Sequence, residues 1–244
     1  MTRREALGVL GAAASPLVAQ SGVTFPKGAV IRTLLKVLDP AELAGGATLF
    51  HEHMQLGTDF NAKFNAASAA VRAANAPPAA AAKPVADAPK PLPAAAPKPA
   101  AAKGPDIMRD PDLMAAEVAK VKDAGVKCIV DAGHADMGRD IGFLRQVAMK
   151  CGVPIVAGGG FYSQPFYPKE ISTMTEDQIF RALVKQADDD TIGVYGEIGS
   201  WDEMTRDERK VFRAVGRAHV ATNLPVFTHT GIPGKAAIEQ LDIL

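Results

Sequence analysis

The chain has 244 residues, with 27 basic and 27 acidic side chains and therefore no formal net charge at pH 7. This length suits one large α/β domain. The balanced charge and the lack of a basic run argue against a nucleic-acid partner, and two cysteines, Cys128 and Cys151, are too few for a disulfide framework.

Residues 1–20 are typical of an export signal. The basic start contains the pair Arg3-Arg4, and residues 6–19 are small and apolar but shorter than the roughly 20 residues of a membrane-spanning helix. The arginine pair resembles a twin-arginine signal, although it could also arise by chance. We therefore expect a periplasmic or secreted protein that has no stable membrane anchor after cleavage and folds from residues 21–244.

A glycine turn followed by a short apolar strand is predicted at residues 45–50, and His51-Glu52-His53 follows directly. Because side chains alternate between the two faces of a strand, the histidines face the same way and Glu52 points away. Such a pair can hold one metal ion, and two surface histidines are the alternative. Metal binding is favoured because the chain has only five histidines.

Residues 66–104 are predicted to be a disordered insertion rich in alanine, proline and lysine. Dense proline is incompatible with helix and sheet, so this composition favours an extended coil. The alanine-rich residues 61–75 predict a short helix that leads into the coil. We interpret the segment as a surface insertion after the first strand, and a domain linker is the alternative.

The remaining residues alternate between predicted helices and buried strands. Thr205 is a suitable N-cap, with Glu208 completing a capping box, and Thr175 is a second N-cap. Helices are expected at 111–124, 139–150, 175–187, 205–222 and 234–244, and strands at 127–131, 154–157, 193–198 and 224–228.

Five strands, each followed by a helix, imply parallel pairing with right-handed crossovers. An open doubly wound sheet and a (β/α)₈ TIM-type barrel both fit this order. No GxGxxG motif follows the first strand, so a dinucleotide site has no support. The barrel is favoured because the candidate ligands lie at the C-terminal ends of strands, where barrel enzymes have their active sites. Only about five βα units are present, and we interpret the chain as a truncated barrel.

The strand ends bring together a set of candidate metal ligands. His51 and His53 end the first strand, Glu197 ends the fourth, and His229 ends the fifth. Imidazole and carboxylate donors suit Zn²⁺, and also Mn²⁺, Co²⁺ or Fe²⁺. A carboxylate can bridge two metal ions that activate water for attack on an ester or phosphoester.

These stretches resemble the phosphotriesterase family of the amidohydrolase superfamily. The likeness rests on GGATLFHEH, on VDAGHADMGRD with the downstream GFY, on GEIG, and on ERKVFRAVGRAHVATNLPVFTHT. It implies a (β/α)₈ barrel with two divalent metal ions. By this resemblance, His51 and His53 hold the more buried metal and His229 holds the second. At the position of Glu197, phosphotriesterases proper have a carboxylated lysine. The phosphotriesterase homology proteins resemble this chain, because they have a glutamate there.

The family pattern also has a histidine on strand six and an aspartate on strand eight that handles the proton of the attacking water. The sequence offers no counterpart, so the catalytic residue is unknown and we expect this chain alone to be inactive. The resemblance implies hydrolysis of a small-molecule ester, lactone or phosphoester. Amide or cyclic-amide hydrolysis and a non-catalytic periplasmic metal-binding protein are the alternatives, and a homodimer is left open.

A few further residues are weaker candidates. Phe161, Tyr162 and Trp201 follow strand ends and could line the substrate pocket, with core packing as the alternative for the first two. Asp131 could orient a ligand histidine from outside the metal shell, or it could be an ordinary strand-end carboxylate. His134 is predicted to be a loop residue near the barrel mouth.

Overall fold

The computed structural model describes residues 24–74, 104–231 and 235–244. The predicted export signal lies outside these residues. Helix α2 (Phe60–Ala74) confirms the helix predicted at 61–75. It also corrects the start of the predicted insertion, because residues 66–74 are helical. Alanine has the highest helix propensity, and the first proline of the segment is Pro77. The rest of the insertion lies outside the described residues, except Gly104.

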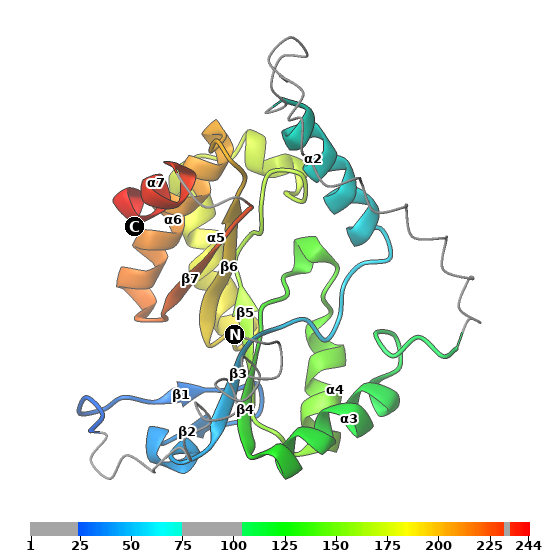
Figure 1. The fold of residues 1–244 in the computed structure, drawn as a ribbon. Coiled ribbons are helices and arrows are strands. Elements are labelled where there is room, and N and C mark those ends of the chain that lie inside the picture. Colours follow the sequence, from blue (N-terminus) through cyan, green and yellow to red (C-terminus); the bar gives the residue numbers. More distant parts are fainter. Residues whose placement is uncertain (1–23, 75–103, 232–234) are drawn as a thin grey trace, which may run out of the picture.

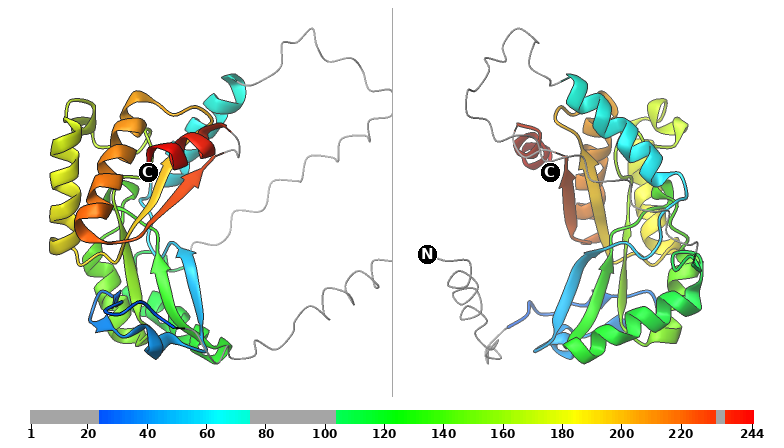
Figure 2. Two further views of the ribbon diagram at one scale, coloured as in Figure 1. Left: turned by 90° about the vertical axis from the view of Figure 1, so that its left-hand side faces the viewer. Right: turned by 45° about the vertical axis from the view of Figure 1, so that its right-hand side comes forward.

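A five-stranded sheet forms the centre of the fold (Figure 1). Every neighbouring pair is parallel, and the order in space is the order along the chain. The sheet is curved and corresponds to part of a (β/α)₈ barrel, which confirms the predicted fold class (Figure 2). The strands are β3 (Ala47–Glu52), β4 (Val126–Asp131), β5 (Ile155–Gly159), β6 (Val194–Ser200) and β7 (Val226–Thr230).

Helices follow the strands and cover one face of the sheet (Figure 2). The capping boxes of Thr175 with Gln178 and of Thr205 with Glu208 are both present, so each helix begins where side chains satisfy its free N–H groups. No helix within the described ranges is both long and apolar enough to cross a membrane. The helices are α3 (Pro111–Ala119), α4 (Ile141–Cys151), α5 (Glu176–Asp189), α6 (Arg206–Thr222) and α7 (Lys235–Ile243), with short 3₁₀ segments η2 (Lys120–Ala124), η3 (Ala135–Met137) and η4 (Lys169–Ser172).

The main hydrophobic core lies between the helices and the sheet, where Leu144, Leu183 and Phe212 are fully buried. A smaller cluster includes Cys128 and Val130 and packs against Ile31 of a hairpin. The hairpin, β1 (Ile31–Arg32) with β2 (Val37–Leu38), and the following 3₁₀ segment η1 (Pro40–Leu43) were not predicted. Two-residue strands are too short for hydrophobic alternation to be recognised.

Candidate metal centre

Three histidines converge on the buried carboxylate of Glu197, which is on β6. The Nε2 atom of His53 lies 3.1 Å from Oε1, whereas the Nε2 atom of His51 lies 3.2 Å from Oε2. The Nδ1 atom of His229, on β7, lies 2.7 Å from the same Oε2 atom. The structure therefore brings together all four residues that the sequence predicts as metal ligands.

The two histidines of the HEH motif face the same way, as strand alternation predicts. His51 is the fifth residue of β3, and His53 directly follows the strand. Their ring centroids are 5.3 Å apart, and the rings are inclined at 61°. The side chain of His51 is 44% exposed and that of His53 is 25% exposed, whereas that of Glu197 is 3% exposed. The nitrogen donors therefore border solvent, and the carboxylate forms the floor of the site.

The spacing of the donor atoms fits a transition-metal ion. Zinc bonds to nitrogen and oxygen are about 2.0–2.2 Å, so two ligands on one ion at tetrahedral to right angles lie roughly 3.0–3.4 Å apart. The distances from Glu197 to His51 and His53 fall in this range, and that to His229 is slightly shorter. The donor atoms of His51, His53 and Glu197 all lie within 4.8 Å of one another. Three imidazoles and one carboxylate are a donor set typical of zinc.

The charges of the site are strongly coupled. Burial raises the pKa of Glu197, but interactions with His229 and His53 outweigh burial and bring that pKa well below its usual range. For His53, burial lowers the pKa, and the contact with Glu197 more than reverses this effect. Glu197 is therefore a carboxylate across the physiological pH range, as a metal ligand must be.

Two residues outside the ligand set, Gly158 and Gln240, hold β6 and β7 in position beside the site. A Cβ atom on Gly158 of β5 would lie 2.2 Å from the carbonyl oxygen of Gly196, so only glycine allows β5 to approach β6 this closely beside Glu197. On α7, the buried Gln240 donates from Nε2 to the Ser200 hydroxyl at 2.8 Å and to the His229 carbonyl at 2.9 Å. The sequence alone gives no sign of this role of Gln240, because nothing local marks a glutamine that links two strand ends.

Asp131 acts on the backbone rather than on a histidine ring. Its Oδ2 accepts the N–H of Met54 at 2.8 Å, and its Oδ1 accepts that of Gly133 at 3.0 Å. Burial raises the pKa of Asp131, although both backbone donors partly oppose this. Asp131 thus fixes the chain directly after His53, so its effect on that histidine is indirect. This geometry matches the alternative of a satisfied strand-end carboxylate.

The three aromatic candidates have different surroundings. Phe161 packs against the main core, with its ring centroid 6.3 Å from that of Tyr167, so it fills the core instead of lining the site. The Tyr162 hydroxyl lies 3.2 Å from Nε2 of His229. The ring of Trp201 lies 5.4 Å from that of Phe64 on α2, which places both beside the strand ends.

Two buried titratable residues follow β4. His134 lies in the loop after β4, as predicted, but it is fully buried, and burial lowers its pKa to about 4. Burial raises the pKa of Asp136 to about 7. Nδ1 of His134 and Oδ1 of Asp136 are 3.7 Å apart. Asp136 also accepts the backbone N–H of Tyr162 at 2.9 Å. Asp136 was not predicted, because a single acidic residue in a loop carries no signal of burial.

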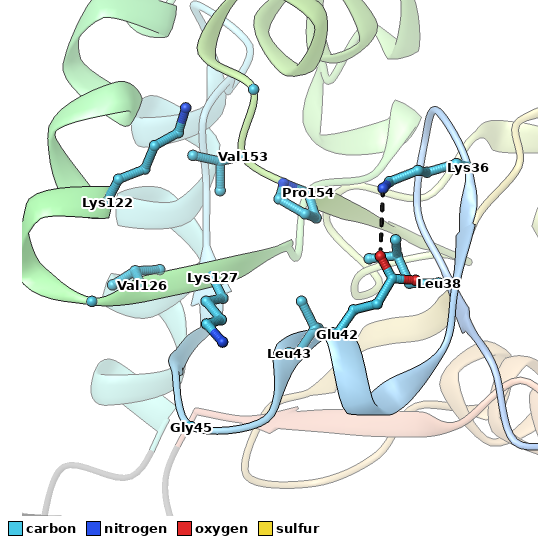
Figure 3. A pocket seen from close by; sticks show the side chains of 12 residues that line it. Lys36, Leu38, Glu42, Leu43, Gly45, Lys122, Val126, Lys127, Val153 and Pro154 are labelled. Atoms are coloured by element: carbon cyan, nitrogen blue, oxygen red, sulfur yellow. Dashed lines mark ion pairs between the residues drawn. The ribbon is translucent and has the colours of Figure 1, made fainter.

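A separate cleft of about 400 Å³ lies beside the N-terminal ends of β4 and β5 (Figure 3). Lys36 forms a 3.6 Å ion pair with Glu42, and Lys127 donates to the Ala44 carbonyl at 2.7 Å. Two of its three lysines are therefore already partnered, and its lining includes no histidine. The metal-type donors are at the opposite ends of the strands. The cleft is lined by Lys36, Leu38, Glu42, Leu43, Gly45, Lys122, Gly125, Val126, Lys127, Gly152, Val153 and Pro154.

Comparison with known proteins identifies similar sequences and folds. A sequence model described as the phosphotriesterase family matches residues 29–244. An N-acetyltaurine hydrolase from Danio rerio is 31% identical over 134 residues, which are 52% of this chain and 38% of that protein. An aryldialkylphosphatase from Saccharolobus solfataricus is 34% identical over 134 residues, which are 52% of this chain and 43% of that protein.

Solved structures share the fold. The crystal structure of the phosphotriesterase homology protein from Escherichia coli, complexed with phosphate in its active site, superposes with a TM-score of 0.59. The match has 23% sequence identity and covers 81% of this chain and 57% of that chain. The matched residues thus cover between 38% and 57% of the length of these three proteins.

Proposed function

Because this chain belongs to the phosphotriesterase family, we propose that its four converging side chains are part of a binuclear metal centre that hydrolyses an ester, lactone or phosphoester. The observation that carries the proposal is the meeting of His51, His53 and His229 on the buried carboxylate of Glu197. The two ions are most simply zinc, and manganese, cobalt or iron would suit the same donors. When bound, such ions activate water as a nucleophile and polarise the substrate oxygen.

The protein side chains have separate roles in this proposal. Both oxygens of Glu197 face imidazole nitrogens, so this carboxylate would be shared between an ion held by His51 and His53 and an ion held by His229. Its burial keeps bulk water away from the floor of the site, while the half-exposed His51 borders solvent.

Amide hydrolysis is a second candidate for the same centre. It is supported by the 31% identity to an N-acetyltaurine hydrolase, whose substrate is an amide. The aryldialkylphosphatase supports the phosphoester reaction to a similar degree. Both reactions need a nucleophilic water and a polarised oxygen, so the residues above serve either one. A panel with one phosphotriester, one lactone and one N-acetyl amino acid separates the reactions.

Metal content is the direct test of the centre. We expect the purified chain to retain two equivalents of transition metal after dialysis, and His51→Gln to retain fewer. His219→Gln is the matched control, because Nδ1 of His219 lies 2.7 Å from the Leu224 carbonyl, on α6 and away from the cluster. One equivalent or none in the unaltered chain would contradict the binuclear proposal. Hydrolysis of any panel member would exclude the non-catalytic alternative and overturn the expectation that this chain alone is inactive.

A further inference from the structure

His229 presents its two ring nitrogens to different partners. Nδ1 faces the Glu197 carboxylate at 2.7 Å, and Nε2 faces the Tyr162 hydroxyl at 3.2 Å. The rings of His229 and Tyr162 meet edge to face, with centroids 5.2 Å apart and an interplanar angle of 71°. The nitrogen directed into the candidate centre is thus Nδ1, and the tyrosine occupies the other side of the imidazole.

The proton on His229 must change position when a metal is bound. Without metal, Nδ1 is a donor to Glu197, so in the neutral ring Nε2 carries a lone pair and needs a donor. A metal ion needs the Nδ1 lone pair, so Nε2 then carries the proton and needs an acceptor. A phenol hydroxyl can donate in the first state and accept in the second, whereas a carbonyl can only accept.

Tyr162 is held firmly enough to serve as this partner. Its backbone N–H donates to the buried Asp136 carboxylate at 2.9 Å, and its carbonyl accepts the N–H of Gly199, on β6, at 2.6 Å. Its ring centroid lies 5.0 Å from that of Phe166 and 6.2 Å from that of Phe60. Tyr162 is only 2% exposed, so its hydroxyl is directed at His229 rather than at solvent.

We propose that Tyr162 is a positioning residue for the metal centre, whose hydroxyl holds the His229 ring in both tautomers and so keeps Nδ1 aimed at the ion. This proposal rests on the proposed function, because it assumes that His229 binds metal. This role differs from that of lining the substrate pocket, which stays a prediction for Tyr162. Asp136 contributes by fixing the backbone from which the tyrosine side chain extends.

Tyr162→Phe tests the proposal, because it removes only the hydroxyl. Losing the partner of a metal-binding histidine typically lowers metal affinity 10–100-fold. We therefore expect one of two Zn²⁺ equivalents to bind 10–100-fold more weakly in a chelator competition. Tyr167→Phe is the matched control, because the Tyr167 hydroxyl is buried without a hydrogen-bond partner among the described residues and lies outside the cluster.

The tautomer of His229 provides a second measurement that does not depend on activity. In ¹⁵N spectra of the histidine rings, we expect the His229 proton to move from Nδ1 to Nε2 when Zn²⁺ is added. In Tyr162→Phe without metal, we expect mixed His229 tautomers. In the Zn²⁺-bound variant, we expect the proton on Nε2 but broadened His229 signals. Spectra and affinities equal to those of the unaltered chain would overturn the role of Tyr162 and leave the metal centre intact. Failure of the unaltered chain to bind Zn²⁺ would instead overturn the proposed function and this inference with it.

Discussion

The Nδ1 atom of His229 lies 2.7 Å from Oε2 of Glu197, the shortest of the three histidine contacts with that carboxylate. It joins the ends of two neighbouring parallel strands, β6 and β7. Because the carboxylate is buried, its close neighbours are the imidazole nitrogens around it and not bulk water. A metal ion bound at this position would take the place of the protons that lie between the histidine nitrogens and the Glu197 carboxylate.

Replacing Glu197 with glutamine is expected to reduce metal binding sharply. The substitution keeps the size of the side chain but removes the charge and one acceptor oxygen. The loss of affinity should exceed the 10–100-fold effect typical of an outer-shell partner. Metal content after dialysis measures it. Glu42→Gln is the control, because Glu42 is an exposed residue paired with Lys36 at the other end of the fold. Unchanged metal content in Glu197→Gln would show that Glu197 is not a ligand.

Replacing Gly158 with alanine is expected to disturb the same centre from a distance. The new Cβ would lie 2.2 Å from the Gly196 carbonyl, a backbone atom that can move only together with Glu197. Overpacking of this kind costs about 1–3 kcal/mol of unfolding free energy. Urea unfolding and metal affinity should both decrease. Gly104→Ala is the control, because its Cβ would meet nothing within 4 Å. Equal stability of the two variants would contradict the close approach.

Much of the architecture was predictable, because each strand and helix carries its own hydrophobic period. Local sequence predicts the regular alternation of strands and helices, and this alternation indicates the fold class. Local sequence also predicts the capping boxes at Thr175 and Thr205. His51, His53 and Glu197 were predicted because ligands at parallel strand ends converge by geometry alone. These predictions do not depend on contacts between residues that are distant in the sequence.

The remaining features depend on contacts between distant segments. The link from Asp136 through Tyr162 to His229 requires knowledge of the loops after β4 and β5, which have no periodic pattern. Phe161 and Tyr162 are adjacent in the sequence, yet one fills the core and the other reaches the site. Composition cannot distinguish these positions, because burial is set by neighbours far away in the chain.

Replacing Asp131 with asparagine is expected to destabilise the fold and weaken metal binding. Asp131 accepts two backbone N–H groups, and an amide can accept only one of them and opposes the other with its own donors. An unsatisfied buried donor costs about 1–3 kcal/mol. One of these groups belongs to Met54, directly after His53. Thermal unfolding and Zn²⁺ affinity should both fall, whereas Asp112→Asn, on an exposed ion pair with Lys150, should change neither. A stable variant with full affinity would contradict the anchoring role.

Replacing Asp136 with asparagine is expected to change the pH dependence of stability. Burial raises the pKa of Asp136 to about 7, so between pH 4 and 7 the folded protein keeps a proton that the unfolded chain loses. Stability from this group therefore falls as pH rises through this window, by up to about 4 kcal/mol, and is constant above it.

His134, whose pKa is lowered to about 4, contributes with the opposite sign up to about pH 6.5. The two effects partly cancel in the unaltered chain, so only a comparison isolates Asp136. Asparagine cannot ionise, so urea unfolding should show the variant gaining stability relative to the parent from pH 4 to 7. Parallel curves would mean that Asp136 titrates at its ordinary pKa.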